Sequence, residues 1–139
     1  MRLQDLMKTS VETIGEGQSA DDAFERMRLR RIRHLVVVDG KKVAGVVSQR
    51  DIANEAGRAG RSVRDVMSSP AVTAGPEMTV RQAANLLRGR TLGCLPILEK
   101  SKLVGIVTIT DLLELVGRGA ERPAPRPGRR LLERRGARR

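Results

Sequence analysis

Two short segments of the chain combine residue types that could bind a ligand. Residues 45–51 and 105–111 both read glycine, two apolar residues, serine or threonine, two further residues and aspartate. Each segment lies where an apolar run gives way to a short predicted helix, whose free N–H groups suit a phosphate. A carboxylate at that place can accept hydrogen bonds from two neighbouring hydroxyl groups. The candidate pairs are Ser48 with Asp51 and Thr108 with Asp111.

The same spacing has a second interpretation that requires no ligand. A serine or threonine followed three residues later by an acidic residue is a capping box, in which the two side chains satisfy free N–H groups at the start of a helix. A helix needs these hydrogen bonds whether or not anything binds beside it. The spacing of the four residues alone therefore leaves both interpretations open.

The two segments belong to a longer internal repeat. Residues 5–52 align with residues 65–112 at a constant offset of 60 and without a gap. A match of this length at one offset indicates two copies of one supersecondary unit. Identical residues occur along its whole length: Asp5 and Asp65, Met7 and Met67, Thr13 and Thr73, Gly15 and Gly75, Leu35 and Leu95, Asp51 and Asp111.

Each copy has the pattern of a β-α-β-β-α unit. The first copy opens with a turn at 3–7 and a strand near 11–14. An amphipathic helix follows in each copy, opened by the capping boxes Ser19/Asp22 and Thr79/Gln82. Strands are expected at 35–38, 43–47, 95–98 and 103–107, and short helices after Ser48 and Thr108.

The strands are apolar on both faces, which indicates that both faces are covered. One copy alone is too small to cover its own sheet. We therefore predict an α/β (α+β) fold in which two β-α-β-β-α repeats pack sheet against sheet about a pseudo-two-fold axis.

Composition excludes several classes of protein. One cysteine in 139 residues rules out an internal disulfide or a cysteine-rich zinc site, and one histidine rules out a multi-histidine metal site. Phe24 is the only aromatic residue, so stacking platforms for single-stranded nucleic acid are absent. No apolar run approaches the length of a membrane span, and the N-terminus lacks a signal-peptide pattern. We expect a cytoplasmic protein without membrane insertion.

Basic charge is concentrated at the C-terminus. Residues 118–139 contain nine arginines and two acidic residues, which is +7 of the net charge of +11. They also contain three prolines and show no apolar periodicity, so we predict a disordered Arg/Pro-rich tail, with at most a short helix over 129–135. The predicted organisation is repeat 1 with a linker over 1–60, repeat 2 over 61–117, and the tail over 118–139.

The repeated motifs resemble those of the cystathionine β-synthase (CBS) domain, present as a tandem pair or Bateman module. The resemblance covers roughly residues 3–117 and leaves out the tail. Its motifs occur in the same order in both copies: Asp-Leu-Met at 5–7 and Asp-Val-Met at 65–67, the strand motifs at 33–39 and 94–98, and the glycine-to-aspartate signatures at 45–51 and 105–111.

The resemblance implies a regulatory module and not an enzyme. CBS pairs bind adenosine-containing ligands (AMP, ADP, ATP or S-adenosylmethionine) in clefts between the repeats, and they signal to a partner protein by changing geometry. The sequence does not name that partner. Two pairs commonly form a flat dimer, and we predict a homodimer because apolar residues of the short helices have no obvious cover. These residues are Ile52, Leu112, Leu113 and Leu115.

The resemblance also assigns ligand-binding positions. Asp51 and Asp111 would bind ribose, and an apolar strand residue would flank the purine. The first site has Arg50 beside its acid and should favour more phosphate charge, whereas Thr110 leaves the second neutral for AMP or an uncharged adenosine ligand. Either site could be composite, with Thr13 or Thr73 facing the acid of the other repeat. The predicted residues are Thr13, His34, Val36, Ser48, Arg50, Asp51, Thr73, Leu95, Pro96, Thr108, Thr110 and Asp111.

Two other classes of function remain as alternatives. In the first, the tail is an electrostatic arm for weak nucleic-acid contact, and the repeat pair is only a dimerisation platform. The second, an enzyme, needs a nucleophile or metal constellation that the sequence does not indicate. His34 has no serine or cysteine partner, and Cys94 begins a buried strand as a small hydrophobic residue. We predict no catalytic and no metal-binding residues.

Overall fold

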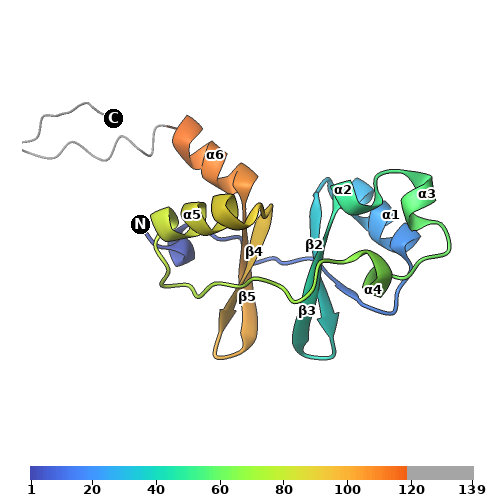
Figure 1. Ribbon diagram of the computed structural model, residues 1–139. Coiled ribbons are helices and arrows are strands. Elements are labelled where there is room, and N and C mark those ends of the chain that lie inside the picture. The colour runs from blue at the N-terminus through green and yellow to red at the C-terminus, as the bar shows by residue number, and fades with distance from the viewer. Residues whose placement is uncertain (119–139) are drawn as a thin grey trace, which may run out of the picture.

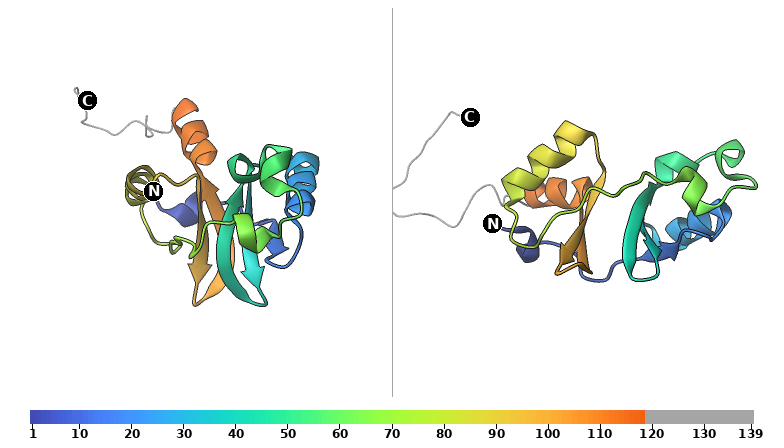
Figure 2. Two further views of the ribbon diagram at one scale, coloured as in Figure 1. Left: turned by 45° about the vertical axis from the view of Figure 1, so that its right-hand side comes forward. Right: turned by 60° about the horizontal axis from the view of Figure 1, so that its bottom comes forward.

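The computed structural model describes residues 1–118 and contains two α/β lobes whose sheets adjoin in the middle (Figure 1). The predicted tail from residue 119 onward, with the short helix considered at 129–135, lies outside the described residues. The helices lie on the outer side of each sheet, as the two rotated views also show (Figure 2). The expected arrangement of sheet against sheet is therefore confirmed.

The first lobe has a three-stranded sheet in the order β1-β2-β3. Strand β1 runs parallel to β2, and β2 and β3 form an antiparallel hairpin. The elements are β1 (Thr13–Gly15), α1 (Ala20–Arg30), β2 (His34–Asp39), β3 (Lys42–Ser48), α2 (Gln49–Ile52) and α3 (Glu55–Arg58).

The second lobe repeats this hairpin with the same register, including an irregularity after the fourth residue of its first strand. Its elements are α5 (Val80–Arg90), β4 (Cys94–Glu99), β5 (Lys102–Thr108) and α6 (Ile109–Gly117). Within the described residues, the place of β1 is taken by a single parallel bridge between Ala74 and Ile97.

The missing strand has a simple cause. In the first lobe, Glu16 N–H donates to the carbonyl oxygen of Val38 (3.2 Å) and extends the pairing of β1 with β2. The equivalent residue 60 positions later is Pro76, which has no N–H to donate. At the other end of β1, Val36 N–H donates to the Glu12 carbonyl (3.2 Å), and Pro96 replaces Val36 in the second lobe. The predicted β-α-β-β-α unit is thus complete in repeat 1 and shortened in repeat 2. The strand expected at 11–14 begins two residues later, at Thr13.

The long helices start at the predicted caps. Asp22 N–H donates to Ser19 Oγ (3.0 Å) at the start of α1. At the start of α5, both bonds of the box form, from Gln82 N–H to Thr79 Oγ1 (3.1 Å) and from Thr79 N–H to Gln82 Oε1 (3.0 Å). These caps fix where each helix begins against its sheet.

The short segment before each repeat packs on the other repeat. The 3-10 helix η1 (Leu3–Asp5) lies beside α5, where Leu3 N–H donates to the Met78 carbonyl (2.9 Å) and the Leu3 side chain is fully buried. Helix α4 (Val63–Val66) packs against α1, and Val63 N–H donates to the Gln18 carbonyl (2.7 Å). Figure 1 shows the N-terminus beside the second lobe and α4 beside the first. Each lobe therefore completes its core with a segment that precedes the other repeat.

A third apolar cluster joins the two lobes. Val36, Cys94 and Ile106 are buried there, with partly buried side chains from both sheets around them. Burial raises the pKa of the Cys94 thiol to about 12, so the side chain stays neutral and packs as a small hydrophobic residue. Within residues 1–118, every helix is too short or too polar to cross a membrane.

Candidate functional site

Gly45 and Gly105, which begin the two signatures, lie where another segment of the chain crosses close to the strand. We call residues 7–8 and 67–68 the crossing segments. A Cβ atom at Gly45 would lie 2.5 Å from the carbonyl oxygen of Ser68, and one at Gly105 would lie 2.5 Å from Met7 Sδ. A larger residue at position 45 would therefore displace the backbone of the crossing segment, and one at position 105 would displace the Met7 side chain and crowd the Lys8 carbonyl oxygen (3.0 Å). The close backbone approach that the glycines allow is made by the segments that follow η1 and α4.

Asp51 caps the start of α2 and remains exposed. Its Oδ2 accepts hydrogen bonds from both the N–H and the hydroxyl of Ser48, each at 2.9 Å. The predicted capping box at Ser48 is therefore formed. Among the residues that the structure describes, the second carboxylate oxygen, Oδ1, has no hydrogen-bond or ion-pair partner. This oxygen is an acceptor that can take a hydrogen bond from a hydroxyl group of a ligand.

Asp111 occupies the equivalent position in repeat 2, but its surroundings differ. Its Oδ2 accepts from Thr108 N–H (2.8 Å), and Thr108 Oγ1 accepts from Asp111 N–H (3.1 Å). Its Oδ1 forms an ion pair with Lys8 Nζ (3.1 Å), and the residue is only 6% exposed. Thr110 is uncharged, as the sequence indicates, but the crossing segment brings the charged side chain of Lys8 to this aspartate.

His34 lies at the junction of the two lobes. It begins β2 opposite Ser48, and its imidazole ring lies where a Cβ of Gly93 would be. Burial lowers the pKa of His34, an effect that Arg33 and Arg50 add to and that the carboxylate of Asp51 opposes. The structure thus brings four predicted residues together, namely His34, Ser48, Arg50 and Asp51.

The apolar residues predicted to flank a purine are covered by other side chains. Val36 is fully buried in the cluster between the sheets, and Pro96 is buried in β4 opposite Ile106. Leu95 is fully buried in the core of the second lobe, among residues of η1 and α5. None of the three offers an open surface to a ligand in this conformation.

The predicted threonines lie at more open positions. Thr13 is half-buried in β1 beside Val36, and its carbonyl accepts a hydrogen bond from Arg26 Nη1 (2.5 Å). Thr73 is half-buried next to the bridge residue Ala74, and Thr110 is exposed in the first turn of α6. Among the described residues, no hydrogen bond joins the side chain of any of these three threonines to either aspartate.

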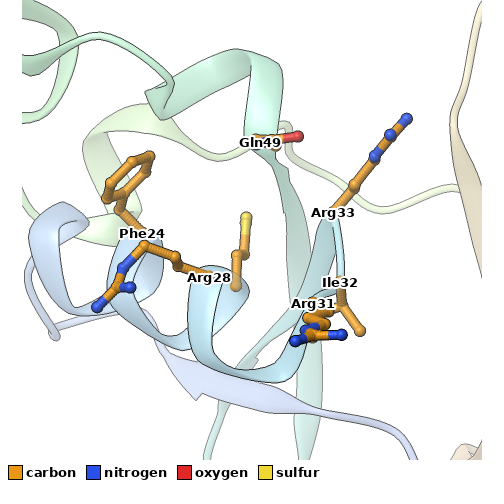
Figure 3. A pocket seen from close by; sticks show the side chains of 7 residues that line it. Phe24, Arg28, Arg31, Ile32, Arg33 and Gln49 are labelled. Carbon is orange, nitrogen blue, oxygen red and sulfur yellow. The ribbon is translucent and has the colours of Figure 1, made fainter.

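A surface cavity of about 340 Å³ lies on the first lobe, and its lining includes Arg33 and Gln49, the sequence neighbours of His34 and Arg50. It lies between the end of α1 and the start of α2, with Phe24 and Arg28 on one side and Gln49 on the other (Figure 3). Arg31, Ile32 and Arg33 form the remaining edge. The local sequence pattern gives no sign of this cavity, because its lining comes together only when α1 packs against α2.

The apolar residues expected to be uncovered are only partly so. Ile52 is fully buried in the core of the first lobe, because α2 packs against α1, and Leu112 packs on the core of the second lobe. The exposed apolar residues of α6 instead form a stripe at helical spacing: Ile109, Leu113 and Val116, which are 42%, 65% and 57% exposed. Within residues 1–118, no group of three or more His, Cys, Asp or Glu side chains is arranged to hold a metal ion.

Two copies of one α/β unit, packed sheet to sheet and each completed by a segment from the other, define a tandem-repeat module. The CBS domain family model matches residues 3–58 and 63–118. The chain therefore belongs to the CBS domain family and contains a CBS pair, as the resemblance implied.

Comparisons with individual proteins agree with this assignment. The chain is 32% identical over 114 residues to the CBS domain-containing protein YhcV of Bacillus subtilis, covering 79% of this chain and 81% of YhcV. It is 29% identical over 116 residues to a homoserine O-acetyltransferase of Methanohalobium evestigatum, covering 82% of this chain but only 24% of that enzyme. The chain thus corresponds to about a quarter of the length of such enzymes.

Solved structures share the fold. A crystal structure of a putative acetoin utilization protein, AcuB, from Vibrio cholerae has a TM-score of 0.74 and 27% identity, covering 90% of this chain and 98% of that one. The CBS domain pair of protein MJ0100, solved in complex with 5′-methylthioadenosine and S-adenosyl-L-methionine, has a TM-score of 0.79 and 23% identity, covering 85% of this chain and 97% of that one.

Proposed function

We propose that this CBS pair is a regulatory module that binds an adenosine-containing ligand between its repeats and signals occupancy to a partner protein. The observation that carries the proposal is the exposed Asp51 carboxylate: Ser48 fixes one of its oxygens, and the other has no partner within residues 1–118. A fixed carboxylate with a free acceptor suits the adjacent hydroxyls of a ribose. The fold likeness to the MJ0100 pair, which binds two adenosine derivatives, supports the same ligand class.

The charges near Asp51 favour a ligand that carries phosphate. Arg33 and Arg50 lie close enough to His34 to lower its pKa, and both side chains are exposed. Neither has a carboxylate partner among the ion pairs of residues 1–118. Guanidinium groups bind phosphate oxygens with good geometry. AMP, ADP and ATP are therefore the ligands we propose for this site, and S-adenosylmethionine is the competing candidate.

Calorimetric titration with AMP, ATP and S-adenosylmethionine tests the proposal, and Asp51→Ala supplies the decisive variant. Loss of a charge-assisted hydrogen bond should weaken binding at this site by about tenfold to a hundredfold. Asp65→Ala is a matched control, because Asp65 Oδ2 accepts from the N–H and hydroxyl of Ser62 (3.0 and 3.1 Å) in an equivalent capping box of α4. If both variants bind like the parent, Asp51 is only a helix cap.

We also propose that the pair acts without catalysis of its own and as a homodimer. The chain matches enzymes over about a quarter of their length, which supports a regulatory part. The apolar stripe on α6 is the surface we propose for self-association, and a similar fold occurs in a hexameric CBS-CP12 protein (25% identity, TM-score 0.76). Nucleic-acid contact through the tail concerns residues outside the described part, and no observation on residues 1–118 favours it.

A further inference from the structure

The two signature aspartates differ in the residue that the crossing segment places beside them. Position 8 is lysine and the equivalent position 68 is serine. Both are held in the same way. Lys8 exchanges two backbone hydrogen bonds with Ile106 (3.0 and 2.9 Å), and Ser68 exchanges two with Val46 (2.8 and 3.0 Å). The backbone therefore presents position 8 to the Asp111 site just as it presents position 68 to the Asp51 site.

The difference in side chain leaves one acid open and the other occupied. Both oxygens of Asp111 have partners, Thr108 N–H on Oδ2 and Lys8 Nζ on Oδ1. The Asp111 side chain is only 5% exposed, whereas that of Lys8 is 65% exposed. The lysine thus covers the acid from the solvent side and can move away without disturbing the core. Asp51 remains exposed on its helix, with only Ser48 as its partner among the described residues.

We propose that Lys8 is an internal counter-ion that closes the Asp111 site to uncharged adenosine ligands. This inference rests on the proposed function. A ribose can bind Asp111 only if its hydroxyls replace the ammonium group, and a neutral ligand gives that ammonium no new partner. A ligand with a phosphate provides such a partner, because the Lys8 ammonium group can move from the Asp111 carboxylate to the phosphate oxygens. Among the ion pairs of residues 1–118, none involves Asp51, so the two sites differ in this part of the chain.

Exchanging the side chains at the two equivalent positions tests this gate. The probes are 5′-methylthioadenosine, which has no phosphate, and AMP. Asp51→Ala isolates the Asp111 site, and Lys8→Ser in this background should strengthen 5′-methylthioadenosine binding by about tenfold or more. The same change should leave AMP affinity unchanged or reduce it. Ser68→Lys in the parent chain should weaken 5′-methylthioadenosine at the Asp51 site by a similar factor.

The control for charge is Lys41→Ser, which removes one exposed lysine at the β2–β3 turn. It should leave the affinities for 5′-methylthioadenosine and AMP unchanged. Circular dichroism confirms that each variant is folded. If Lys8→Ser leaves the affinity for 5′-methylthioadenosine unchanged while the parent binds it at both aspartates, the gate is wrong and the proposed function stands. If neither these two probes nor ADP, ATP or S-adenosylmethionine bind the parent or any variant, the proposed function itself is wrong and the gate falls with it.

Discussion

His34 and Gly93 are in contact across the boundary between the two repeats. The imidazole ring of His34 occupies the space where any side chain at position 93 would begin. The contact joins the start of β2, where His34 pairs with Ser48, to the residue that precedes β4. Ser48 in turn hydrogen-bonds Asp51 at the start of α2. A change at this contact should therefore affect both the packing of the lobes and the Asp51 site.

Gly93→Ala should displace the His34 ring. We expect a loss of stability of about 1–3 kcal/mol from overpacking, and weaker adenine-nucleotide binding at Asp51. Gly89→Ala is the control, because a Cβ at Gly89 in α5 meets nothing within 4 Å and should stabilise the helix by about 0.5–1 kcal/mol. Urea unfolding measures both. Adding His34→Ser to Gly93→Ala should recover part of the loss, and no recovery would show that the clash lies elsewhere.

Stability should depend on pH through His34. Burial lowers its pKa from the ordinary value of 6.5, so as the pH falls the unfolded chain takes up this proton before the folded chain does. The stability contribution is therefore complete above about pH 6.5 and is lost as the pH falls toward the lower, folded-state pKa. Urea unfolding between about pH 8 and pH 5 should show a steeper loss for the parent than for His34→Gln. Parallel curves would contradict the assignment.

Thr91, at the end of α5, has a strained backbone conformation that a substitution should relieve. Thr91 caps this helix in the left-handed conformation (φ 54°, ψ 50°), which a β-branched residue rarely adopts. Thr91→Gly should raise stability by about 1 kcal/mol, seen as a higher melting temperature. Arg90→Gly, one residue earlier and inside the helix, should instead lower stability by up to about 1 kcal/mol. If both changes destabilise equally, the left-handed conformation at residue 91 is not the source of strain.

The exposed stripe of α6 should control self-association. Leu113 is 65% exposed at the centre of the stripe, and a charge there would have to be buried in any interface built on it. Leu113→Asp should shift the chain toward monomer in sedimentation or light scattering. Leu29→Asp is the control, since Leu29 is equally open (71%) but lies on α1 outside the stripe. A parent chain that is already monomeric at micromolar concentration would contradict the proposal.

The sequence predicted the elements that depend on local pattern. Strand runs, helix caps and the offset of 60 all follow from residues close together in the chain, and the structure confirms them. The loss of the first strand in repeat 2 was also foreseeable, because Pro76 replaces a hydrogen-bond donor. Only an explicit comparison of the two copies at this position would have revealed it.

The partner of Asp111 could not be predicted in this way. Lys8 and Asp111 meet because η1 packs on the far lobe, and a contact between residues this distant in sequence leaves no periodic trace along the chain. The burial of Ile52 could not be predicted for the same reason. Its apolar side chain is compatible with an exposed position as well as with the core beneath α1, where it lies. Local pattern identifies which residues are apolar or charged, but the long-range packing decides which of them are covered.

Each crossing segment connects one repeat to the sheet of the other. Each segment is clamped by two backbone bonds beside the signature glycine of the opposite sheet, and then leads directly into its own repeat. A rotation of one lobe would therefore shift Lys8 or Ser68, the residue that its crossing segment places at the aspartate site of the other lobe. We therefore expect ligand binding at either proposed site to change the affinity of the other, and thermodynamic linkage requires the two effects to be equal in size.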